Sequence, residues 1–169
     1  MIKNFIPNMF TFANLSFGML SIMFAFSGNS KLAAIMILCA AFIDRYDGRI
    51  ARKICAESPM GKELDSLADL VSFGAAPALL SWIVFLQGFN VIGYIIAILF
   101  PITGAFRLAR YNVTEADNIF SGVPITVAGS IMAIDMLIAL MYRNHILIST
   151  LLILLLSYLM VSKIKIRKI

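Results

Sequence analysis

Six long apolar segments divide this chain of 169 residues and constrain its fold more than any other feature. They cover residues 8–26, 32–44, 69–86, 91–107, 123–141 and 146–161. A transmembrane helix needs about 20 mainly apolar residues, and most of these segments approach that length. With 61% hydrophobic residues and a mean hydropathy of +0.93, the chain is too apolar for a soluble domain. We therefore predict an all-α, polytopic membrane protein with six transmembrane helices in a single domain, residues 1–169.

The second and third segments are each polar at one end. The apolar part of the second stops at Ile43, and Asp44 follows at once. A helix over 31–53 would still cross the membrane, because 23 residues at about 1.5 Å each span about 34 Å. The third helix begins polar near Gly61 and ends apolar at Leu86. The two polar ends are therefore expected to meet on the same side of the membrane.

The distribution of lysine and arginine predicts which side that is. Of the 14 basic residues, only Lys31 and Arg143 fall on the side opposite the N-terminus in this arrangement. Basic residues concentrate on the cytosolic side of membrane proteins. We therefore expect both termini and the polar helix ends to face the cytosol, in the cytoplasmic or plasma membrane. The basic residues do not line one soluble face, so the net charge of +5 does not indicate a nucleic-acid partner.

Four aspartates lie at these polar ends: Asp44, Asp47, Asp65 and Asp69. The first two are three residues apart and the last two are four apart, so each pair lies on one face of its helix. Charged side chains near hydrocarbon are costly and are usually functional. Hard oxygen ligands of this kind favour Mg²⁺ or Mn²⁺, and two such ions can clamp a diphosphate during in-line displacement. We therefore predict a site for two divalent ions.

Small and basic residues between the aspartates suit a phosphate ligand. Gly48 and Ala51 remove side-chain bulk from one helical surface, and Gly61 does the same on the facing segment. Arg52 can offer two parallel hydrogen-bond donors to a phosphate. These four residues are therefore candidates for contact with a nucleotide and its diphosphate.

The complete pattern, D(x2)DG(x2)AR(x8)G(x3)D(x3)D from Asp44 to Asp69, resembles the signature of the CDP-alcohol phosphotransferase family. The resemblance implies an integral membrane enzyme that transfers a substituted phosphate from a CDP-linked donor to an alcohol and releases CMP. It further implies divalent metals and a homodimer. By position, Asp44, Asp47 and Asp65 look like metal ligands, and Asp69 looks like both a metal ligand and the general base. The residues that would line the CDP-linked lipid are Gly48, Ala51, Arg52 and Gly61.

The flanks of the signature indicate the acceptor. Segments 64–78 and 106–113, with several positions between 7 and 18, resemble the bacterial and archaeal members that use L-serine. The candidates for binding the acceptor or a phosphate are Arg107, Arg110 and Asn112. The two arginines would equally serve as cytosolic anchors. Glycerol 3-phosphate and inositol phosphate are the alternative acceptors within the family.

A divalent-cation transporter would also bring carboxylates into a membrane. Such a protein would be expected to carry polar groups at the midplane of several helices, or internal repeats. Here the acids gather at the cytosolic end of one helical hairpin, which favours the enzyme. Two further residues stand out: Pro77, which is expected to kink the third helix, and Asp135, which is alone near the middle of the fifth.

Overall fold

Helices form nearly all of the part of the chain that the structure describes. The computed structural model covers residues 5–54, 59–113, 120–142, 145–162 and 165–166, with side chains for 8–46, 59–113, 122–142 and 145–162. The α-helices are α1 (Phe5–Phe26), α2 (Ser30–Ile54), α3 (Pro59–Asp69), α4 (Ala76–Val84), α5 (Asn90–Val113), α6 (Ile125–Ala139) and α7 (Ile146–Val161). A π-helix, η2 (Leu70–Ala75), joins α3 to α4, and a 3-10 helix, η3 (Leu86–Phe89), precedes α5. Two short strands, β1 (Phe120–Ser121) and β2 (Lys165–Ile166), pair antiparallel.

These helices fall where the apolar segments predict them. Three stretches of the described chain are long and apolar enough to cross a membrane, namely Asn8–Phe26, Pro59–Val84 and Leu86–Val113. The helices α6 and α7 are apolar but shorter. The predicted all-α class is therefore confirmed for the described residues, with the two-residue strands β1 and β2 as the exception.

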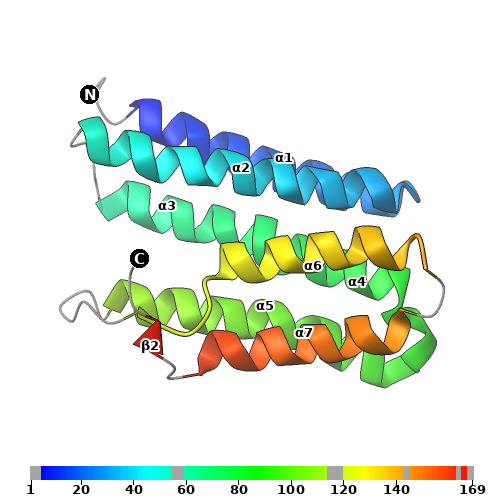
Figure 1. Cartoon of the computed structure of the whole chain (residues 1–169). Helices are drawn as coiled ribbons and strands as arrows, with labels where there is room; N and C mark the ends of the chain where they lie inside the picture. Colours follow the sequence, from blue (N-terminus) through cyan, green and yellow to red (C-terminus); the bar gives the residue numbers. More distant parts are fainter. Residues whose placement is uncertain (1–4, 55–58, 114–119, 143–144, 163–164, 167–169) are drawn as a thin grey trace.

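The helices form an elongated bundle (Figure 1). The helices α1 and α2 lie side by side, and α3 lies next to them. The helix α6 contacts both α2 and α7, and α5 packs along α7. The end of α2, the start of α3 and the end of α5 lie at one end of the bundle, at the left of Figure 1. The polar ends of the second and third predicted helices therefore do meet at the same end.

The core of the bundle consists of large apolar side chains that are completely buried. Examples from five different elements are Ile37, Phe73, Phe100, Met132 and Ile153. Many leucines, isoleucines and phenylalanines are exposed on the outside, as expected for a surface that faces lipid. Inside a bilayer the helices gain little from leaving water, so close packing of these side chains stabilises the bundle instead.

The helix that carries Asp65 and Asp69 changes its hydrogen bonding immediately after Asp69. In η2 the backbone N–H of Ala76 donates to the carbonyl of Val71, five residues earlier. The next residue, Pro77, has no N–H and cannot donate to the carbonyl four residues before it. The structure therefore has a π turn immediately before Pro77, the residue at which a kink was expected. Such π turns within α-helices are frequent at functional sites.

Asp135 is buried in α6 and faces the start of α7. Its Oδ1 lies 3.7 Å from Nδ1 of His145, the residue that precedes α7. Only 6% of Asp135 is exposed, and a buried carboxyl group is costly unless a polar neighbour compensates it. The structure therefore gives Asp135 a partner that the sequence does not reveal, away from the other aspartates.

Candidate functional site

Three of the four predicted metal ligands lie together where α2 meets α3. One carboxylate oxygen from each of Asp44, Asp65 and Asp69 lies within 4.8 Å of the other two. Asp44 and Asp65 are partly exposed, whereas Asp69 is only 7% exposed. Three carboxylates at this separation repel one another, and a bound cation would remove that repulsion. Their oxygen atoms and spacing fit Mg²⁺ or Mn²⁺.

The predicted residues at the end of α2 lie partly outside what the structure describes. The backbone of α2 continues as a helix to Ile54. The side chains of Asp47, Gly48, Ala51 and Arg52 lie outside the described residues. Gly61 is described and lies half-buried in the first turn of α3, on the same helix as Asp65 and Asp69. The roles of all five residues therefore remain predictions.

Asp69 is held by side chains from two other helices. Asn14 of α1 donates a hydrogen bond from Nδ2 to Asp69 Oδ1, at 3.1 Å. Thr126 of α6 donates from Oγ1 to Asp69 Oδ2, at 3.4 Å. Sequence reasoning did not assign either residue to the site. For Asn14 the available signal was its place among the positions between 7 and 18 that resemble the serine-using members. For Thr126 there was only a hydroxyl in an apolar helix, which more often mediates helix packing.

A glycine allows α1 to approach the segment that follows Asp69. A Cβ atom at Gly18 would clash with the Oγ of Ser72, so α1 and η2 are in close contact there. The Ser72 hydroxyl also donates to the backbone carbonyl of Asn14, at 3.0 Å. Asn14 lies one turn before Gly18, and Asp69 lies about one turn before Ser72. The close approach at Gly18 therefore also brings Asn14 to Asp69.

A second glycine has the same effect on α6. A Cβ atom at Gly129 would lie 2.7 Å from the Cβ of Phe73, closer than real side chains allow. Thr126 lies about one turn before Gly129, and Asp69 lies about one turn before Phe73. The close contact between Gly129 and Phe73 therefore also brings Thr126 to the carboxylate of Asp69. The helices α1 and α6 therefore enclose Asp69 because each carries a glycine at the point of contact.

Replacing Gly129 by alanine is expected to destabilise the protein by about 1–3 kcal/mol, because the added methyl group forces α6 away from η2. The measurement is thermal unfolding of the purified protein in detergent. Gly88→Ala is the matched control, because a Cβ atom at Gly88 has no neighbour within 4 Å. An unchanged melting temperature for Gly129→Ala would contradict the close contact.

The three predicted acceptor residues lie near the end of α5, with different surroundings. Arg107 is 8% exposed, and its Nε has no hydrogen-bond partner among the described residues. Arg110 donates from Nη1 to the carbonyl of Val161, at 3.2 Å, and so connects α5 to the end of α7. Of the two arginines, Arg107 is therefore the more deeply buried.

Asn112 connects α5 to α3. Its Nδ2 donates to Ser66 Oγ at 3.0 Å and to Glu63 Oε1 at 3.3 Å. Its Oδ1 is buried and has no partner among the described residues. Because Ser66 follows Asp65 directly, Asn112 lies next to the helix that carries two of the aspartates.

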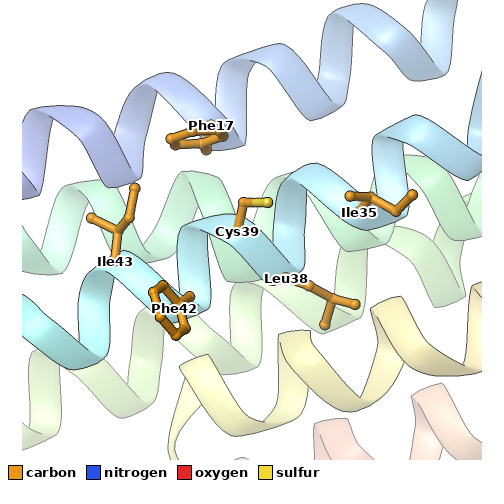
Figure 2. A pocket seen from close by; sticks show the side chains of 6 residues that line it. All are labelled: Phe17, Ile35, Leu38, Cys39, Phe42 and Ile43. Atoms are coloured by element: carbon orange, nitrogen blue, oxygen red, sulfur yellow. The ribbon is translucent and has the colours of Figure 1, made fainter.

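A groove on α1 and α2 lies apart from this cluster. Figure 2 shows its lining of apolar side chains and one thiol, with a volume of about 370 Å³. The lining residues are Phe17, Ile35, Leu38, Cys39, Phe42 and Ile43. Asp44 is nine residues after Ile35 and five after Cys39, so it points to another face of α2. The groove is therefore not part of the aspartate site.

Comparison with known families gives a match over almost the whole chain. A profile of the family described as CDP-alcohol phosphatidyltransferase matches residues 4–163. This range includes all four aspartates and the three residues of α5 discussed above. The match agrees with the resemblance seen in the signature.

Individual relatives show the same similarity. The CDP-diacylglycerol–serine O-phosphatidyltransferase of Bacillus subtilis (strain 168) is 39% identical over 163 residues, which cover 96% of this chain and 89% of the relative. The protein of the same name from Helicobacter pylori (strain J99) is 38% identical over 78% of this chain and 57% of the relative. Archaetidylserine synthase of Methanothermobacter thermautotrophicus is 37% identical over 73% of this chain and 54% of the relative. The matched region thus spans most of the Bacillus relative and little more than half of the other two.

Proposed function

This chain belongs to the CDP-alcohol phosphatidyltransferase family and is a membrane-integral CDP-alcohol phosphotransferase, and from this premise we propose that its acceptor is L-serine. In the proposed reaction, the serine hydroxyl displaces CMP from a CDP-linked lipid, either CDP-diacylglycerol or an ether analogue. The products are a phosphatidylserine-type lipid and CMP. The single structural observation behind the phosphotransfer chemistry is the cluster of Asp44, Asp65 and Asp69 within 4.8 Å at one end of the bundle, and the choice of serine is supported by the relatives whose names include it.

Asp69 is the general base in this proposal. Its carboxylate takes the proton from the serine hydroxyl as the oxygen attacks the phosphorus atom that carries the lipid. The bond between that phosphorus and the oxygen of CMP breaks, and CMP leaves with the electron pair. Asp69 is the most buried of the three clustered aspartates and has a hydrogen-bond donor at each oxygen, which suits a base of fixed orientation.

The residues that would hold two divalent ions are Asp44, Asp47, Asp65 and Asp69. When bound, Mg²⁺ or Mn²⁺ neutralises the charge of the diphosphate and stabilises the departing CMP. Gly48, Ala51, Arg52 and Gly61 would line the CDP moiety. The small residues leave room for the nucleotide against the helix backbone, and the guanidinium of Arg52 would bind a phosphate oxygen.

Serine is proposed as the acceptor on two grounds. The names of the Bacillus and Helicobacter relatives include serine as the acceptor, and the name of the archaeal relative includes its lipid product. In addition, the Nε of the buried Arg107 has no hydrogen-bond partner among the described residues, so this donor is available for the serine carboxylate. Arg110 and Asn112 would complete this binding region on α5.

The proposed topology follows from charge and from the shape of the bundle. In this proposal six helices span the cytoplasmic or plasma membrane, the chain forms one domain over residues 1–169, and both termini are cytosolic. The aspartate cluster then faces the cytosol, where serine is dissolved, while the lipid donor enters from the bilayer. A homodimer is proposed by analogy with the family.

The test is CMP release by the purified protein in lipid-containing detergent with Mg²⁺ or Mn²⁺. CDP-diacylglycerol and its ether analogue are each supplied with serine, glycerol 3-phosphate, inositol phosphate or no acceptor. We expect release at least tenfold faster with serine than with any other acceptor, because a site that binds the serine carboxylate and aims its hydroxyl at the base discriminates against acceptors of another shape and charge. Faster release with a phosphorylated alcohol would keep the family and reject serine, and no release with any acceptor would favour a divalent-cation transporter.

A further inference from the structure

The side-chain amide of Asn14 is buried beside the carboxylate of Asp69, the proposed general base. Asn14 is 1% exposed and donates to Asp69 Oδ1 at 3.1 Å across the contact between α1 and α3. An ionised carboxylate can only accept hydrogen bonds, so the NH₂ group, and not the amide oxygen, must face Asp69. Thr126 completes the arrangement from the opposite side, since its hydroxyl donates to Asp69 Oδ2. Each carboxylate oxygen therefore has one neutral donor.

The position of this amide is itself fixed. The backbone carbonyl of Asn14 accepts a hydrogen bond from Ser72, which lies on the same continuous helix as Asp69. The contact at Gly18 prevents α1 from moving closer and leaves no space for a larger side chain there. Two hydrogen bonds, from Ser72 to the backbone of Asn14 and from the Asn14 side chain to Asp69, thus hold residue 14 opposite residue 69.

We propose that Asn14 is a positioning residue for Asp69, with Thr126 as its weaker counterpart, an inference that rests on the proposed function. The two donors hold the plane of the carboxylate, so that its remaining lone pairs would be available to the acceptor hydroxyl and to a divalent ion. Partners of this kind orient the ligands of a metal site, and their loss typically weakens metal binding by about 10–100-fold. A misplaced base also slows proton transfer, because the reaction needs a narrow range of distances.

The test compares Asn14→Leu and Asn14→Ala, both of which lack the donor, with Ser21→Ala as the matched control. Ser21 is a buried polar residue two turns further along α1, and its hydroxyl has no hydrogen-bond partner among the described residues. We expect both Asn14 variants to lower kcat by about 30-fold or more, with KM for serine and for the lipid donor within about threefold of wild type. Ser21→Ala should retain wild-type kcat.

Two further readouts separate positioning from simple helix packing. The first is Mn²⁺ binding in the absence of substrates, measured by electron paramagnetic resonance, which we expect to weaken about tenfold in the Asn14 variants and to stay unchanged in Ser21→Ala. The second is a double-mutant cycle with Asp69→Asn. Because Asn14 acts through Asp69, Asn14→Ala should lower the residual rate of Asp69→Asn by less than twofold.

Two variants of Thr126, one without and one with the hydroxyl, provide an independent check in case the Asn14 variants do not fold. Thr126→Val removes the hydroxyl at constant shape and is expected to lower kcat about threefold to tenfold, whereas Thr126→Ser restores the donor and most of the rate. Wild-type kcat in a folded Asn14 variant, or in Thr126→Val if neither Asn14 variant folds, would overturn the inference. An equal loss in the Asp69→Asn background would do the same. If Asp69→Asn itself stayed within tenfold of wild type, the assignment of Asp69 as the base would fail instead, and no CMP release by the wild type would reject the proposed function.

Discussion

Replacing Asp69 by asparagine is expected to lower kcat for serine-dependent CMP release by about 10³-fold, equivalent to about 4 kcal/mol of transition-state stabilisation. The substitution keeps the shape of the side chain but removes the atom that accepts the proton. It also places an amide beside the aspartates Asp44 and Asp65, which lie within 4.8 Å. General base catalysis and ligation of a cation are thus lost together.

The measurement for Asp69→Asn is single-turnover release of CMP from labelled CDP-lipid at saturating serine. Asp135→Asn is the matched control, because Asp135 is equally buried but pairs with His145 away from the cluster. The control should retain at least a third of the wild-type rate, a loss of less than about 0.7 kcal/mol. If Asp69→Asn turned over within tenfold of wild type while remaining folded, another group would have to be the base.

Removing divalent cations is expected to abolish turnover completely, and adding Mg²⁺ or Mn²⁺ should restore it. Several carboxylates close together bind a phosphate-rich substrate poorly without cations, because all of the groups are anionic. Asp44→Ala removes one proposed ligand and should raise the cation concentration for half-maximal activity by about 10–100-fold.

The corresponding measurement is CMP release after EDTA treatment, followed by titration with each cation, in wild type, Asp44→Ala and Asp135→Asn. The last variant should follow the wild-type titration, because Asp135 is not near the cluster. Full activity in EDTA would contradict the proposed metal site. An unchanged titration for Asp44→Ala would remove that residue from the ligand set.

The positions of the helices could be predicted because they depend on local composition. The segments 8–26, 91–107 and 146–161 are mainly apolar, and α1, α5 and α7 cover them. In the third segment, Pro77 indicated that the helix would be irregular, but the sequence did not indicate that the irregularity is a π turn. A helix can accommodate the N–H that a proline lacks by a bend or by a π turn, and the segments packed against the helix decide between them.

The aspartate cluster could also be predicted, since helical spacing places each pair of acids on one face. Asp44 lies close to Asp65 and Asp69 because the polar end of α2 meets the polar start of α3, as the sequence predicted. The partners of Asp69 could not be predicted in this way. Asn14 is 55 residues away in the sequence, and nothing in its immediate surroundings indicates which residue it contacts.

The sequence by itself therefore determined the membrane class of this protein, the approximate bounds of its helices and the chemistry of its acids, because each depends on residue type and short-range spacing. Only the tertiary structure decided that Asn14 and Thr126 hold Asp69, that Asp135 pairs with His145, and that Arg107 is buried. These contacts depend on how closely helices approach one another. That distance is set at glycines such as Gly18 and Gly129, where a missing side chain on one helix admits the backbone of another.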